Sequence, residues 1–183
     1  MKQQATRYHL LLIALHWLLA FLIIAALALG ATKLAPMQNS NPEKIDGIRV
    51  HMIGGMFILA LVLVRLLARN VTVHPAKATT GNLFLDKVAW ISHRLLYIAI
   101  ITMPLMGLAL AYQSGLFSIV FAHQGALPPD LWVYWTRTGH YLISRLLMFL
   151  IALHICGALY HTFILRDGLL RRMWFGKRKI SGK

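Results

Sequence analysis

The chain has 183 residues, of which 58% are hydrophobic and only 13% are charged. A soluble domain averages about 25% charged residues. The 19 Lys and Arg residues far outnumber the 5 Asp and Glu residues, a balance that would also suit a protein that binds nucleic acid. Such proteins do not carry several long apolar segments, however. The composition therefore excludes a nucleic-acid partner and predicts an integral membrane protein.

Four apolar segments reach the roughly 20 residues that a helix needs to cross a bilayer. In chain order they cover residues 8–31, 47–67, 88–112 and 136–165. Polar connections rich in turn residues separate them, such as "KLAPMQNSNPEKID" after the first segment. The sequence shows no internal repeat and no soluble domain. It predicts an all-α membrane protein in which residues 1–183 form a single four-helix bundle.

Basic residues are distributed unevenly around these segments. One set of segment ends is flanked by Lys2, Arg7, Arg65, Arg69, Lys77, Lys87, Arg166, Arg171, Arg172, Lys177, Arg178, Lys179 and Lys183. The connection from Gln113 to Trp135, at the opposite membrane face, contains no Lys or Arg. By the positive-inside rule both termini are expected in the cytoplasm. The basic C-terminal tail is expected to contact lipid headgroups.

Four of the nine histidines lie inside apolar segments at two matching depths. At about 1.5 Å per helical residue, His16 and His154 share a depth in the cytoplasmic half, and His51 and His140 share one in the outer half. The 14-residue spacing of His140 and His154 keeps them on nearly one helix face, about 21 Å apart along the axis. Two histidines at one depth on facing helices are what a bis-imidazole b haem needs.

Three other interpretations of these histidines are open. They could be hydrogen-bonded packing residues, zinc ligands, or members of a proton relay. A structural zinc site usually gathers four ligands, whereas these histidines are divided between two depths. A relay commonly uses a buried acid, whereas all five acids lie near segment ends or in loops. The depth-matched pairs therefore favour two haem irons, and the absence of a C-x-x-C-H motif excludes a covalent c-type haem.

Other polar residues of the segments rank below these four. Arg145 lies between the two histidines of the fourth segment, where a guanidinium group is costly, so we expect it to bind the cofactor through a haem propionate or to meet a backbone carbonyl. His93 and His161 compete as ligands, and we expect non-ligand roles for both. Interfacial anchoring is the expected role of Arg49, Arg65, Arg94 and Arg137.

A family resemblance rests on motifs in all four segments. These are "HW" at His16, "RVHMIGGMFILALVLVRLLAR", "SHRLLYIAIITMPLMGLALAY" and "GHYLISRLLMFLIALH" with "LRDGLLRRM". Over essentially its whole length the chain resembles the bacterial cytochrome b561 family, which is related to the cytochrome b subunits of membrane formate dehydrogenases and nickel–iron hydrogenases. The resemblance implies a four-helix bundle in the bacterial cytoplasmic (inner) membrane. It also implies two non-covalent b haems, held by the pairs His16/His154 and His51/His140.

The resemblance also implies electron transfer to or from ubiquinone, and one branch of the family oxidises superoxide and passes the electron to quinone. We therefore expect a di-haem cytochrome that exchanges electrons with a quinone, with superoxide:ubiquinone oxidoreductase as one form of that activity. As an enzyme, it would be an oxidoreductase acting with quinone. The alternative is a membrane-anchor cytochrome b subunit that takes electrons from a redox partner protein of a larger respiratory dehydrogenase or hydrogenase. Few basic residues lie near the outer face to attract superoxide: Lys33, Lys44, Arg49 and Arg137.

Overall fold

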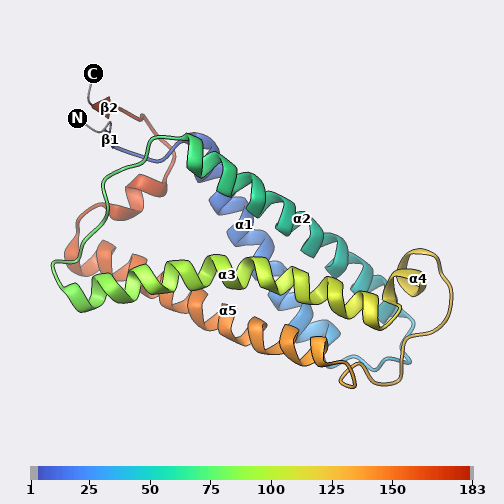
Figure 1. Cartoon of the computed structure of the whole chain (residues 1–183). Coiled ribbons are helices and arrows are strands. Elements are labelled where there is room, and N and C mark those ends of the chain that lie inside the picture. The colour runs from blue at the N-terminus through green and yellow to red at the C-terminus, as the bar shows by residue number, and fades with distance from the viewer. Residues whose placement is uncertain (1–3, 182–183) are drawn as a thin grey trace.

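The protein is a bundle of long helices in a computed structural model that describes residues 4–181, so Lys2 and Lys183 lie outside the described part. In chain order the elements are β1 (Gln4–Ala5), α1 (Leu10–Ala28), η1 (Leu29–Leu34), α2 (Glu43–Val71), α3 (Leu83–Gln113), α4 (Leu116–Phe121), α5 (Trp135–Leu159), η2 (Tyr160–Leu165), η3 (Leu169–Met173) and β2 (Ile180–Ser181). Four helices are long and apolar enough to span a membrane: α1 continued by η1, α2, α3, and α5 continued by η2 (Figure 1). The predicted all-α, four-span fold is confirmed.

Helices α2 and α3 extend at both ends beyond the apolar segments that predicted them. Helix α2 begins at Glu43 rather than at residue 47 and ends at Val71 rather than at residue 67. Helix α3 begins at Leu83, where the Asn82 side chain accepts hydrogen bonds from the first turn. Hydrophobicity marks the part of a helix that lies in lipid, whereas capping groups set its ends. Polar helix ends are therefore invisible to a search for apolar segments.

The long helices pack mainly as α3 along α5, α1 along α2, and α2 along α3. A core cluster lies midway along the bundle and takes two buried residues from each long helix: Leu19, Ile23, Ile58, Val62, Leu96, Ala99, Leu147 and Leu150. Leu147 lies halfway between His140 and His154 in sequence and is only 2% exposed. The core therefore separates the two histidine depths by a layer of aliphatic side chains.

The two chain ends meet at one end of the bundle (Figure 1), where β1 and β2 pair antiparallel. Side chains secure this junction: Arg178 donates hydrogen bonds to the carbonyls of Arg7 and Val73, and Trp17 Nε1 donates to Met173 O at 2.8 Å. An even number of crossings brings both termini to the same side. That this side faces the cytoplasm stays a prediction.

A short helix closes the opposite end of the bundle. Helix α4 lies within the connection that the sequence predicted to be a loop, and it packs its buried Val120 against Ile48 and Ala111. Arg49 Nε donates to Val120 O at 2.9 Å, which ties α2 to α4. Six residues are too few for a recognisable helical period, so this helix could not be predicted from the sequence.

Candidate functional site

His51 on α2 and His140 on α5 face each other near the end of the bundle that carries α4. Their ring centroids are 6.1 Å apart, and both residues are half-buried. His140 Nδ1 donates to the carbonyl of Met103 on α3 at 3.1 Å. That bond fixes the imidazole tautomer and leaves Nε2 free for a metal, an arrangement common in metal-binding histidines. His51 Nδ1 is buried without a hydrogen-bond partner among the described residues.

A large cavity lies beside this pair. Its volume is about 930 Å³, and its lining includes both histidines together with Gly55 and Gly107. A Cβ atom added at Gly55 would meet no atom within 4 Å, so this glycine leaves open space one turn after His51. Binding sites for small molecules and cofactors commonly have volumes of about 300–1,000 Å³. The cavity is therefore large enough for a cofactor of substantial size.

Gly107 sets the distance between α3 and the ring of His140. A Cβ atom at this position would lie 3.2 Å from His140 Cε1 and 3.4 Å from Nδ1, closer than most real Cβ contacts. Because Gly107 has no side chain, the imidazole of His140 can approach the α3 backbone, where the Met103 carbonyl accepts a hydrogen bond from His140 Nδ1. Gly107 and Met103 could not be identified from the sequence, because their role depends on how α3 and α5 cross and not on any local motif.

His16 on α1 and His154 on α5 form the second pair, near the end of the bundle where the chain termini meet. Their ring centroids are 6.2 Å apart. His93 on α3 also contacts this pair, with its ring centroid 5.2 Å from that of His154. His93 Nδ1 donates to the carbonyl of Ala89 in its own helix at 2.6 Å. Three imidazoles from three helices thus meet at this depth.

The spacing of the rings tests whether the pairs suit a haem iron. Metal–imidazole nitrogen bonds are about 2 Å long, so two imidazoles that bind one iron from opposite sides have ring centres about 6 Å apart. The separations of 6.1 Å in His51/His140 and 6.2 Å in His16/His154 fit this requirement. The 5.2 Å between His93 and His154 is too short for that arrangement. Residues 4–181 contain no group of three or more His, Cys, Asp or Glu side chains suited to a metal ion.

Arg145 contacts the ring of Tyr141, in its own helix. Its guanidinium carbon lies 4.9 Å from the ring centroid, its side chain is exposed, and it borders the cavity beside His51 and His140. No hydrogen bond to a backbone carbonyl is found for Arg145 within residues 4–181. Cation–π contact with the aromatic ring offsets part of the cost of its charge. The predicted contact of Arg145 with a cofactor stays a prediction.

His161 is hydrogen-bonded to an acidic residue, Asp167. Its Nδ1 lies 2.6 Å from Asp167 Oδ2, and the imidazole is buried. Desolvation raises the pKa of Asp167, but its hydrogen bonds with His161 and with the Leu169 amide outweigh that effect and hold the pKa below its ordinary value. The ionised carboxylate therefore orients His161 toward the η2–η3 turn, in keeping with the predicted non-ligand role.

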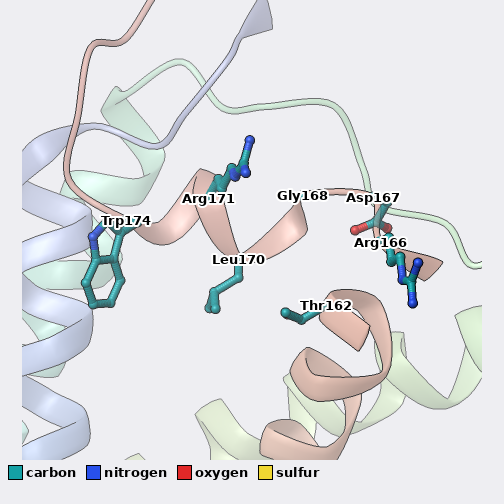
Figure 2. A pocket seen from close by; sticks show the side chains of 7 residues that line it. All are labelled: Thr162, Arg166, Asp167, Gly168, Leu170, Arg171 and Trp174. Carbon is teal, nitrogen blue, oxygen red and sulfur yellow. The ribbon is translucent and has the colours of Figure 1, made fainter. Parts of the chain in front are cut away.

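A second pocket of about 620 Å³ lies against this turn. Figure 2 shows that Arg166 and Arg171, the two basic residues in its lining, point in different directions. Trp174 lies on the side of the pocket away from Arg166. Recognition of an anion needs several donors directed at one place. This pocket therefore does not assemble a polar site comparable to the two histidine pairs.

Known proteins match this chain over most of its length. The family model of prokaryotic cytochrome b561 matches residues 7–176. Cytochrome b562 of Cereibacter sphaeroides is 32% identical over 174 residues, which cover 93% of this chain and 96% of that protein. The protein named Probable superoxide oxidase CybB of Yersinia pestis is 28% identical over 177 residues, which cover 94% of this chain and 98% of that protein. Cytochrome b561 homolog 1 of Escherichia coli is 28% identical over 173 residues, covering 88% and 93%.

These matches extend over almost the whole chain and include all four long helices. Together with the four apolar spans, they identify a multi-pass protein of the bacterial inner membrane. The haem-compatible spacing of the histidine pairs agrees with the cytochrome names of two of the relatives. The chain belongs to the prokaryotic cytochrome b561 family of membrane haem proteins.

Proposed function

We propose that this protein binds two b haems and transfers electrons to or from a quinone dissolved in the membrane. The single observation that carries the proposal is the presence of two histidine pairs, His16/His154 and His51/His140, each with the ring spacing of a bis-imidazole iron. Helix α5 contributes to both pairs. When bound, each haem supplies one-electron Fe(III)/Fe(II) chemistry. Two such centres, one near each membrane face, suit electron transfer across the bilayer.

The side chains of the protein position these centres and keep water away from the space between them. The Met103 carbonyl holds the His140 ring in one tautomer, and Gly107 allows the ring to reach that carbonyl. The core around Leu147 and Leu150 fills the middle of the bundle with aliphatic side chains. None of these residues undergoes bond chemistry. Their contribution is orientation and a low-dielectric environment.

Basic residues support an orientation with both termini in the cytoplasm, since they gather around the end of the bundle where the termini meet. The His51/His140 pair would then face the periplasm, and His16/His154 the cytoplasm. Exposed apolar side chains cover the long helices, among them Phe21, Phe57 and Phe149, and they suit contact with lipid.

A superoxide:quinone oxidoreductase activity is favoured by the charges around the cavity beside His51 and His140. Lys44 and Arg137, two of the four basic residues near this face, belong to its lining together with Arg145, so three positive charges border one cavity. Such a concentration of positive charge attracts an anion. In the balanced reaction, two superoxide ions each lose one electron to give two O₂ molecules, and one quinone takes up two electrons and two protons to give quinol. One relative carries the name superoxide oxidase.

Anaerobic mixing of the dithionite-reduced, desalted protein with excess ubiquinone-1 tests the quinone reaction. We expect the haem α band to decay to the oxidised spectrum, with one quinone reduced for every two haems. Ferricyanide serves as the control that both haems can be oxidised. Protein that ferricyanide oxidises but ubiquinone leaves reduced would contradict the quinone proposal. Copurification of a stoichiometric redox partner would favour the alternative role as a membrane-anchor subunit.

A further inference from the structure

Arg65 is half-buried, and residues 4–181 offer its charge no acidic partner. It lies on α2, on the half of the bundle that holds His16 and His154. Its Nε atom is buried without a hydrogen-bond partner among the described residues. A buried donor left without an acceptor is costly, and the cost is larger when the donor is charged. The ion pairs of residues 4–181 are Arg49–Asp46 and His161–Asp167, so neither involves Arg65.

One side of the Arg65 guanidinium is held in place by α3. Its Nη1 donates to the hydroxyl of Tyr97, and its Cζ lies 5.7 Å from the centroid of the Tyr97 ring. Tyr97 is one turn beyond His93, whose ring contacts that of His154. The Arg65–Tyr97 pair therefore orients the guanidinium and leaves its Nε edge unpaired. Interfacial anchoring, which the sequence suggested for Arg65, would instead place the charged group in solvent.

Arg65 is placed near the His16/His154 pair by its contact with Tyr97, which lies one turn from His93, and the His93 ring contacts that of His154. A b haem carries two propionate carboxylates, and a carboxylate is the partner that a guanidinium binds most strongly, through charge-assisted hydrogen bonds. The residue thus combines a missing acceptor, a missing counter-charge and proximity to one candidate haem site. These three features indicate the same chemical group.

We infer that Arg65, oriented by Tyr97, pairs with a propionate of the haem held by His16 and His154 and sets the reduction potential of that haem. The inference rests on the proposed function, since it requires a haem at this pair. A positive charge stabilises the reduced haem, which carries one more electron than the oxidised haem. Arg65 is therefore a positioning and tuning residue and not an iron ligand.

The test is a redox titration of the purified holoprotein carrying Arg65→Gln. A His140→Leu background leaves one haem, so the measured potential belongs to the His16/His154 site. Removal of one charge in a medium of effective dielectric constant near 20 is expected to disfavour the reduced haem by about ten-fold. This corresponds to a midpoint potential lower by about 59 mV for one electron. Arg65→Lys keeps the charge and should recover most of the shift.

Arg69 provides the matched control. Its guanidinium carbon lies 6.0 Å from the same Tyr97 ring, but the residue is exposed in the last turn of α2. Arg69→Gln removes the same charge. It should shift the midpoint potential by only a small fraction of the shift that Arg65→Gln causes. Equal shifts in Arg65→Gln and Arg69→Gln, or no shift in either, would overturn the inference. If a lipid phosphate is the acceptor at Arg65, neither variant should shift the potential.

Loss of haem has two distinguishable forms in this experiment. The first form concerns the Arg65→Gln variant without the His140→Leu background. If this variant loses only the His16/His154 haem, the result supports propionate anchoring by Arg65. If Arg65→Gln loses both haems, the Tyr97→Phe variant decides: a smaller downward shift supports the inference, and an unchanged potential contradicts it. Wild-type protein that binds no haem would instead contradict the proposed function, before any question about Arg65 arises.

Discussion

Replacement of His154 by leucine is expected to reduce the haem content from two per chain to one. The remaining haem should be the one held by His51 and His140, because the two pairs are separated by the buried layer around Leu147. The His140→Leu variant should lose the other haem and keep the His16/His154 haem. Difference spectra, with haem extracted and quantified per chain, measure both results.

His93→Leu is the matched control for these variants. His93 lies as deep in the bundle as His154 and contacts its ring, but its 5.2 Å ring separation does not suit an iron between the two. The variant should therefore keep both haems, with at most a modest change in spectrum. Loss of a haem in His93→Leu together with retention in His16→Leu would show that His93 and His154 are the true pair.

Replacement of Gly107 by leucine is expected to abolish haem binding at His51/His140. Any side chain at this position meets the His140 ring, since even a Cβ atom would lie 3.2 Å from Cε1. The ring would have to move away from the Met103 carbonyl and lose its orientation. Gly107→Ala, which adds only the Cβ atom, should weaken haem retention without abolishing it. Haem content after passage through detergent columns measures the series.

The haem at His16/His154 serves as the internal reference for the Gly107 series. Fourteen helical residues separate His140 from His154, or about 21 Å along α5, so a local displacement of His140 should not reach the other site. Loss of both haems in Gly107→Ala would indicate general destabilisation of the bundle. Full retention of both haems in Gly107→Leu would contradict the role assigned to His140.

The sequence alone predicted the four spans and both histidine pairings, because depth in a membrane helix follows directly from residue number. The structure brings together His16 with His154 and His51 with His140, at ring separations compatible with a shared iron. Depth carries no information on rotation or on closeness between helices. For that reason Gly107, whose role depends on the α3–α5 contact, could not be identified from the sequence.

Arg65 and Arg145 show that depth along a helix does not predict the direction of a long side chain. The sequence placed Arg145 deep in its segment and predicted cofactor binding, which stays a prediction. The structure shows its exposed side chain over Tyr141, at the border of the cavity beside His51 and His140. Arg65 lay nearer a segment end and suggested anchoring, yet its Nε is buried and unpaired among the described residues. Distance from a segment end measures depth only. The direction of a long side chain depends on the neighbouring helix, here on Tyr97 of α3.

The number of haems bound per chain tests the central claim most directly. Protein purified from membranes in mild detergent would be quantified by amino-acid analysis and its haem by the pyridine haemochrome spectrum of the extracted cofactor. The two ring spacings predict two non-covalent b haems per chain, with b-type α and Soret bands in the reduced-minus-oxidised spectrum. A protein that retains its fold and contains one haem, or none, would contradict the assignment of two haem sites.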